Sequence, residues 1–185
     1  MELFELYNEH NLPFWQSKVR SDVHRDGDWH RSTEVWVFNE NRELLLNLRH
    51  PDKDLFANLW DVCVAGHLLP GENYRTAALR EVQEELGIKV RSSDLHFVDV
   101  WTMDGFDVNS QSFDREFTGV FAWKTTLELS AFTPQPEEIT ELRYVSLPEV
   151  RQMLANPGSG LPFIPMESIF LNIMDRIETT ILPQW

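Results

Sequence analysis

The residues with the clearest chemical meaning lie between positions 66 and 88, where the chain reads GHLLPGENYRTAALREVQEELGI. Glu81, Glu84 and Glu85 stand at i, i+3 and i+4, so a helix would place their carboxylates on one face. Carboxylates this close repel one another, and a hard cation such as Mg²⁺ or Mn²⁺ would offset that repulsion by binding their oxygens. Taken alone, such a cluster also fits a solvated helix face.

A helix over residues 73–86 is predicted from the spacing of its apolar residues. These residues are Tyr74, Ala77, Ala78, Val82 and Leu86. Asn73 is the predicted N-cap, and Gly87 is a natural stop. The segment 60–65, predicted to be a strand, leads directly into this region.

The whole segment 66–88 resembles the Nudix box. Every fixed position of that pattern is filled, at Gly66, Glu72, Arg80, Glu81, Glu84, Glu85 and Gly87. The resemblance implies a metal site formed by Glu81, Glu84, Glu85 and Gly66. Glu81 or Glu84 would orient or deprotonate the attacking water, and Glu72 and Arg80 would form a buried ion pair that clamps the loop onto the helix.

A second resemblance covers residues 4–123, which look like the branch of the Nudix superfamily that includes isopentenyl-diphosphate isomerase. The matching stretches are 30–31, 35–39, 44–49, 53, 59–61, 66–67 and 71–72. Positions that match His30, His67, Asp114 and Glu116 surround a metal in that isomerase. A second metal site that uses His24, His30 and His67 is one interpretation. The other is a set of structural or exposed histidines beside a polar turn at 26–28.

Arg49 and Lys53 match the basic residues that hold the diphosphate in the isomerase. Arginine is suited to bidentate phosphate binding, whereas lysine acts as a point charge. The alternative is that both are ordinary solvated charges. The resemblance therefore makes Arg49 and Lys53 the candidate substrate-binding residues.

Ala65 is the departure that decides against isomerisation. The isomerase has a catalytic cysteine immediately before the Gly-His pair, and alanine cannot move a proton. Cys63 stands two residues earlier, which in a strand would put it on the same face at about 6–7 Å. The intact acidic box indicates hydrolysis instead.

The expected fold is α/β: a Nudix-type α/β/α sandwich with a mixed sheet, formed by one domain over residues 1–185. An N-terminal hairpin is expected at about 3–20, with its turn at 8–11, and a C-terminal helix at about 166–180. The predicted strands are 33–38, 44–48, 60–65, 95–103, 115–123 and 142–146, with a polar loop around Asp104-Gly105. A further helix is predicted at 148–155.

Composition limits the function classes. The chain has 185 residues, 42% hydrophobic and 25% charged, and a net charge of −14. This charge disfavours binding to a nucleic-acid polymer, which needs a basic surface. We expect no membrane span, no signal peptide and a cytoplasmic location. The single cysteine excludes an internal disulfide.

The predicted function is hydrolysis of a diphosphate linkage that depends on Mg²⁺ or Mn²⁺. The expected small-molecule substrate is a nucleoside diphosphate, or one linked to another moiety, with a small isoprenoid diphosphate as the alternative. An isomerase and a non-catalytic nucleotide sensor are the rival functions. The oligomeric state stays open, with a homodimer as one option.

The tryptophans and the acids before the last strand are further candidates for the site. Trp36, Trp60 and Trp123 are predicted to pack in the core, whereas Trp29 and Trp101 are candidates for a substrate wall. The segment 136–139 precedes the last strand. The Nudix resemblance implies that a glutamate in such a loop can act as a base or a metal ligand, but its glutamates are predicted here to be exposed surface acids.

Overall fold

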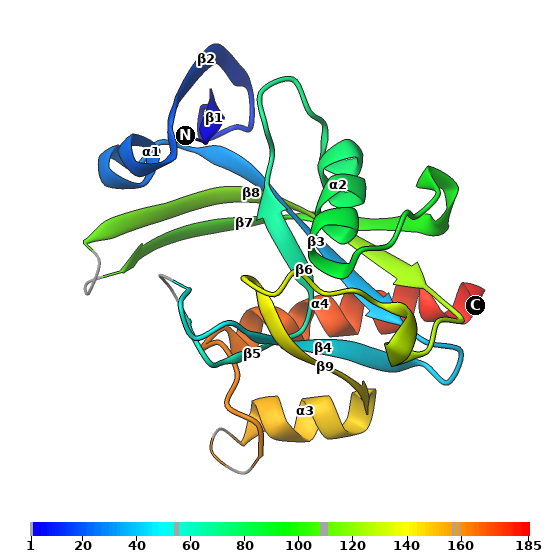
Figure 1. Cartoon of the computed structure of the whole chain (residues 1–185). Helices are drawn as coiled ribbons and strands as arrows, with labels where there is room; N and C mark the ends of the chain where they lie inside the picture. The colour runs from blue at the N-terminus through cyan, green and yellow to red at the C-terminus, as the bar shows by residue number, and fades with distance from the viewer. Residues whose placement is uncertain (1, 54–55, 108–110, 157, 159) are drawn as a thin grey trace.

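The structure is a computed structural model that describes residues 2–53, 56–107, 111–156, 158 and 160–185. Figure 1 shows a central sheet with helices on both of its faces. Residues 108–110, between β7 (Leu95–Asp107) and β8 (Ser112–Lys124) in the chain, lie outside the described residues.

Within the described residues, seven strands form one mixed sheet. Hydrogen-bonded neighbours follow the order β5, β4, β3, β8, β7, while β6 also pairs with β3 and β9 with β4. The remaining strands are β3 (His30–Phe38), β4 (Glu43–Arg49), β5 (Trp60–Asp61), β6 (Val64–His67) and β9 (Ile139–Ser146). The β3–β8 pair is parallel, and its register places His30 beside Glu116. The other pairs are antiparallel.

Helices cover both faces of the sheet, because alternate residues of β3 point to opposite sides. Trp36 and Phe38 pack with residues of α3 (Leu147–Ala155) and α4 (Glu167–Thr180). Val35 and Val37 pack on the other face with α2 (Tyr74–Leu86). This arrangement confirms the α/β/α sandwich with a mixed sheet. The described residues also contain three short 3₁₀ helices, at Ser92–Asp94, Leu129–Ala131 and Leu182–Gln184.

The helix α2 matches the prediction closely. Asn73 caps its start: the Asn73 side chain accepts the Thr76 N–H at 3.1 Å, and Thr76 Oγ1 accepts the Asn73 N–H at 3.0 Å. Gly87 ends the helix in the left-handed region, with φ 71°. Of the expected apolar stripe, Ala77, Ala78, Val82 and Leu86 are buried, whereas Tyr74 is half-buried.

The N-terminal hairpin consists of β1 (Leu3–Tyr7) and β2 (Pro13–Val19), which pair antiparallel. Arg31 attaches the hairpin to the domain: its guanidinium lies 3.9 Å from the Tyr7 ring centroid and 5.1 Å from that of Tyr74. It also donates to Asn11 Oδ1 at 2.7 Å. The turn predicted at 8–11 is therefore tied to the start of α2.

The structure differs locally from the expectations in three places. Residues 20–26 form a helix, α1 (Arg20–Asp26), which was not predicted and which ends at Gly27, inside the polar turn expected at 26–28. The predicted strand 60–65 is two strands. The chain bends at 62–63, so that β5 pairs with β4 and β6 pairs with β3. Asp104-Gly105 is not a loop but part of β7, where Asp104 accepts from Arg115 Nε at 2.7 Å across the hairpin.

Candidate active site

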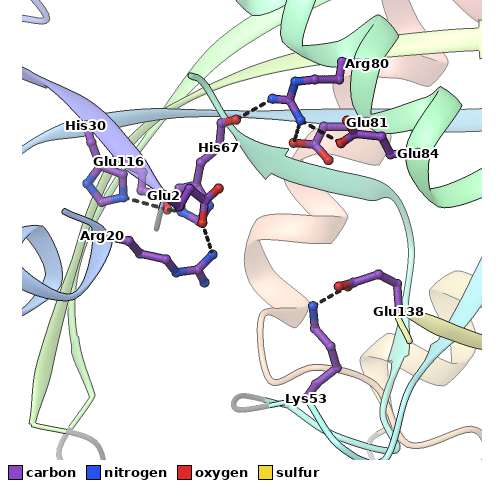
Figure 2. Close-up of polar contacts among 10 residues, drawn as sticks. All are labelled: Glu2, Arg20, His30, Lys53, His67, Arg80, Glu81, Glu84, Glu116 and Glu138. Carbon is purple, nitrogen blue, oxygen red and sulfur yellow. Dashed lines mark hydrogen bonds and ion pairs between the residues drawn. The ribbon is translucent and has the colours of Figure 1, made fainter. Parts of the chain in front are cut away.

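A cavity of about 430 Å³ opens where β3, β6, β8 and α2 meet the loops that follow β4 and precede β9. The side chains that concern its chemistry include Glu34, Arg49, Lys53, His67, Glu81, Glu85, Glu116 and Glu138. Figure 2 draws polar contacts around this region: those of Arg80 on the box helix, those of the histidine cluster (His24, His30, His67, Asp114 and Glu116; of these His30, His67 and Glu116 are drawn), the Glu2–Arg20 pair and the Lys53–Glu138 pair. The cavity lining thus includes the three box glutamates, Arg49 and Lys53, and part of the histidine cluster, whereas His24, His30, Glu72 and Arg80 are not among its lining residues.

Arg80 organises the box. Its guanidinium binds both oxygens of Glu72, at 3.0 and 2.9 Å, and donates to the His67 carbonyl at 2.8 Å. It also contacts Glu81 at 2.7 Å and Glu84 at 3.0 Å (Figure 2). The predicted Glu72–Arg80 clamp is present in the structure, but both side chains keep about a fifth of their surface exposed rather than being buried.

Gly66 allows β6 and α2 to approach closely. A Cβ on Gly66 would lie 2.0 Å from Glu81 Oε1, so any other residue would displace that carboxylate. Burial raises the pKa of Glu81, and the neighbouring Arg80 charge opposes that shift. The glycine of the box is therefore a steric requirement for placing a carboxylate against the strand.

Glu85 has the most unfavourable surroundings of the three box glutamates. No hydrogen-bond partner reaches its carboxylate among the residues that the structure describes. Burial, followed by the charges of Glu81 and Glu138, raises its pKa well above the ordinary value, while Lys53 opposes the shift. A carboxylate held near other acids without a donor is suited to a cation, and this donor set fits Mg²⁺ or Mn²⁺.

The carboxylates of Glu81, Glu84 and Glu85 nonetheless do not converge on one metal position. Among the described residues, two groups of ligating side chains have donor atoms within 4.8 Å of one another, and neither includes a box glutamate. The physical reason is Arg80, which holds Glu81 and Glu84 by charge-assisted hydrogen bonds. Glu85 lies outside this network.

The two groups that do converge share His30: one also contains His24 and His67, the other Asp114 and Glu116. Glu116 Oε1 lies 3.2 Å from His30 Nε2 and 2.9 Å from His67 Nε2. The parallel β3–β8 register produces this contact, since it sets His30 beside Glu116. The structure thus gathers all the histidines and acids predicted for a second metal.

The electrostatics of this histidine cluster suit a cation. Burial, with the nearby His30 and His67, lowers the pKa of His24 to about 4, so His24 is neutral at physiological pH. Burial and the Glu116 charge raise the pKa of Asp114 to about 8. The pKa of Glu116 is well below its usual value, because the two imidazoles outweigh its burial.

Two buried atoms of the histidine cluster lack partners in the described structure: His24 Nε2 and Asp114 Oδ1. His24 Nδ1 lies 3.1 Å from the Phe113 carbonyl, which assigns its proton to Nδ1 and leaves the Nε2 lone pair facing the cluster. Orphaned buried acceptors cost free energy unless a cation or a water satisfies them. These residues therefore fit a metal ion.

Phe4 closes the histidine cluster from the hairpin side. Its ring is 1% exposed and stacks on His67 and His30, with centroid separations of 4.3 and 5.2 Å. The sequence contained no signal for this contact, because Phe4 is separated from both histidines by at least one intervening element. It fixes the orientation of two imidazole rings.

Both predicted phosphate-binding residues border the cavity, and each faces an acid. Arg49 Nη1 lies 3.7 Å from Asp61 Oδ2, and Lys53 Nζ is bonded to Glu138. Glu138 was predicted to be an exposed surface acid. It is instead part-buried, lines the cavity and directs its carboxylate at Lys53 (Figure 2).

Ala65 and Cys63 both border the cavity, but Cys63 lies in the bend before β6 rather than in a strand. The spacing expected for two residues of one strand therefore does not apply. Cys63 Sγ lies 3.6 Å from Asp61 Oδ1, and burial raises the pKa of the thiol well above its usual value. A thiol held in its protonated form is a poor proton acceptor.

Glu34 was missed by the sequence analysis. It borders the cavity from β3 and accepts from Trp36 Nε1 at 3.2 Å. Burial, then the charge of Asp61, raises its pKa to about 7. The available signal was a charged residue inside the otherwise apolar and β-branched run TEVWVF.

The expectations for the tryptophans had mixed outcomes. Trp36, Trp60 and Trp123 are buried in the core as predicted. Trp29 stacks on Phe117, with centroids 4.8 Å apart, and Trp101 borders a separate crevice beside α4. Neither of these two lines the cavity, so the substrate-wall prediction was wrong.

Comparison with known proteins identifies the family. The family model for the NUDIX domain matches residues 28–165. Nudix hydrolase 3 of Arabidopsis thaliana is 37% identical over 142 residues, which are 75% of this chain but 18% of that longer protein. An uncharacterized Nudix hydrolase of Listeria monocytogenes is 32% identical over 170 residues, 92% of this chain and 94% of that protein. The chain therefore belongs to the Nudix family and is a Nudix hydrolase.

The isomerase branch is also represented among the similar proteins. An isopentenyl-diphosphate Delta-isomerase of Nocardia farcinica is 32% identical over 146 residues, 78% of this chain and 80% of that enzyme. Among solved structures, DR0079 of Deinococcus radiodurans has a TM-score of 0.71 at 21% identity, covering 92% of this chain and 98% of that one. This structural similarity establishes the fold.

None of the helices in the described residues is long and apolar enough to cross a membrane. The cytoplasmic location and the lack of a nucleic-acid partner stay predictions.

Proposed function

We propose that this Nudix hydrolase cleaves a diphosphate linkage in a small molecule with the help of Mg²⁺ or Mn²⁺. One observation carries the proposal: a single cavity contains the acidic face of α2 together with Arg49 and Lys53. In-line attack on phosphorus needs carboxylates that bind a metal cation and positively charged side chains that bind the phosphates. The proposed domain is a single unit over residues 1–185.

The box residues divide the work. Glu81, Glu84 and Glu85 would hold the metal with the Gly66 carbonyl, and the bound cation would neutralise phosphate charge and acidify a water. Glu81 or Glu84 would orient that water and accept its proton. Arg80 positions both carboxylates, because it binds each of them and is itself fixed by Glu72. Removing Arg80 would release the catalytic carboxylates from their places.

Arg49 and Lys53 would hold the phosphates that do not react. The Arg49 guanidinium can bind two phosphate oxygens at once, while Lys53 supplies a point charge. The histidine cluster would hold a second cation through His24, His30 and His67, with Asp114 and Glu116 as the neighbouring acids. Its imidazoles are oriented by backbone carbonyls and by Phe4, as metal-binding histidines require.

The proposed substrates are nucleoside diphosphates, or nucleoside diphosphates linked to another moiety. A small isoprenoid diphosphate is the alternative, favoured by the similarity to isopentenyl-diphosphate isomerases. A screen of both compound classes with Mg²⁺ and Mn²⁺, recording phosphate release and product mass, tests the proposal. Loss of all turnover in chelator is expected. Turnover that persists in chelator would refute metal dependence, and turnover of neither class would support the sensor alternative.

Isomerisation is the second candidate, and Ala65 argues against it. We expect no interconversion of isopentenyl and dimethylallyl diphosphate, since no thiolate stands beside Gly66 and the Cys63 thiol is held protonated. Incubation of isopentenyl diphosphate with the protein in heavy water is the sensitive measurement. Deuterium incorporation that disappears in Cys63→Ser would favour a repurposed isomerase.

A further inference from the structure

The mouth of the cavity contains an ion pair between two loops. Lys53 Nζ bonds the Glu138 carboxylate, and each side chain keeps about three tenths of its surface exposed (Figure 2). Within the described residues, Lys53 is the polar partner of the Glu138 carboxylate and Glu138 is the anionic partner of Lys53. The pair is therefore not part of a larger network in that portion of the chain.

The backbone holds the two loops together without the ion pair. His50 N–H donates to the Glu138 carbonyl at 2.8 Å, and Lys53 N–H donates to the His50 carbonyl at 3.2 Å. The β4–β9 ladder also pairs Arg49 with Ile139. The side-chain contact between Lys53 and Glu138 can therefore break while both loops keep their places.

The neighbouring cation offers an instructive contrast. Asp61, which faces Arg49, is 8% exposed and accepts the Val62 N–H at 2.7 Å and the Cys63 thiol. Those contacts fix the Asp61 carboxylate in the cavity wall. Glu138 has no such anchor among the described residues and can rotate into water. Of the two cation–acid pairs, only the Lys53–Glu138 pair is built to exchange.

We propose that the Glu138 carboxylate binds the Lys53 ammonium where a substrate phosphate would otherwise bind. Substrate binding must then displace the Glu138 carboxylate from Lys53. The inference rests on the proposed function, because it takes Lys53 as a phosphate-binding residue. It assigns Glu138 a role in setting substrate affinity rather than in the chemical step. A phosphate oxygen and a carboxylate oxygen compete for the same donor. The binding free energy of the substrate phosphate is therefore reduced by the free energy of the Lys53–Glu138 ion pair.

The exchange also changes the charge around Glu85. Glu138 and Lys53 act on the Glu85 carboxylate in opposite directions. When Glu138 rotates away, Glu85 loses a neighbouring negative charge at the moment the phosphate arrives. Displacement of Glu138 thus lowers the repulsion that an incoming anion would meet.

Binding of imidodiphosphate, a diphosphate analogue that resists hydrolysis, tests the inference in a four-protein cycle. The proteins are wild type, Glu138→Gln, Lys53→Met and the double variant, titrated calorimetrically at fixed Mg²⁺. We expect Glu138→Gln to tighten binding about fivefold, the size expected of a partly exposed ion pair. Lys53→Met should weaken binding, and Glu138→Gln should change nothing further in the Lys53→Met background.

Glu137→Gln is the matched control, since it removes the same charge one position earlier from an exposed side chain. It should change affinity by less than about twofold. Equal tightening by Glu138→Gln and Glu137→Gln, or tightening that survives in Lys53→Met, would show a general charge effect and overturn the inference. Unchanged affinity in Glu138→Gln, or no binding by any of the proteins, would overturn it as well. Because no hydrolysis is measured, the result does not depend on whether a diphosphate substrate is turned over.

Discussion

At the residue scale, Glu84 and Glu85 are neighbours in the chain but have opposite surroundings. Glu84 is half-exposed and contacts Arg80 at 3.0 Å. Glu85 has no donor within the described structure and lies in the field of Glu81 and Glu138. Neutralising each glutamate should therefore change the stability of the metal-free protein differently, although the sequence presents the two residues as equivalent.

Glu84→Gln and Glu85→Gln should each lower turnover by about two orders of magnitude or more, the range for a lost charged catalytic group. Steady-state kinetics on the best substrate at saturating Mg²⁺ measure this loss. A wild-type rate in either variant would remove that residue from the proposed site.

Stability in chelator should separate the two glutamates through its pH dependence. The folded protein raises the pKa of Glu85 above the value of 4.5 for the free side chain. Glu85 therefore destabilises the metal-free fold increasingly as the pH rises above that value. Glu85→Gln should melt at a higher temperature than wild type at pH 7, and the difference should vanish near pH 4. Glu84→Gln should not show this gain, because it loses the Arg80 contact.

Arg49→Lys should raise the Michaelis constant more than it lowers turnover. A residue that binds phosphate equally in the ground state and the transition state affects affinity first, and an ammonium cannot reproduce the bidentate contact. Lys53→Arg should be milder. If Arg49→Ala left both kinetic constants unchanged, Arg49 would be a structural partner of Asp61 alone.

At the scale of elements, α2 carries the box and depends on its first turn. Asn73 and Thr76 exchange hydrogen bonds between side chain and backbone in both directions. These bonds satisfy amide groups that a helix start otherwise leaves without partners. The position of the acidic face relative to Gly66 therefore depends on where this cap begins the helix.

Asn73→Ala should lower the free energy of unfolding by about 1 kcal/mol, as expected for a lost N-cap. Asn73→Asp should preserve most of it. Gln83→Ala, on the exposed face of the same helix, is the control and should stay within about 0.5 kcal/mol. Urea titration measures all three, and equal losses in Asn73→Ala and Gln83→Ala would refute the capping role.

At the scale of the whole molecule, a chain with a net charge of −14 gathers acids from α2, β3, β8 and the loop before β9 around one cavity. Concentrated like charge destabilises a compact state unless cations neutralise it. Divalent metal should therefore stabilise the folded protein by mass action as well as serve the reaction.

Mn²⁺ should raise the melting temperature of the wild-type protein, and the box and the histidine cluster should contribute separately. Glu85→Gln and His67→Gln should each retain part of the Mn²⁺-induced shift, and the double variant should lose all of it. Thermal melting over a Mn²⁺ titration measures this. A full shift in His67→Gln would show that the histidine cluster does not bind the ion.

The sequence by itself determined the box helix, its two ends and the class of the fold. These features follow from local rules: apolar spacing, a capping side chain at Asn73, and a glycine at position 87 that tolerates positive φ. The resemblance to the Nudix box then located the acids on that helix. The main strands were also predictable, because β-branched and aromatic runs mark buried strands.

The tertiary structure decided which distant residues meet. The parallel β3–β8 register joins His30 to Glu116, and the β4–β9 ladder brings Lys53 to Glu138. Sequence spacing carries no record of such pairings, since they depend on how the sheet is assembled. The pKa of Glu34, raised to about 7, has the same origin, because burial and the nearby charge of Asp61 exist only in the folded chain.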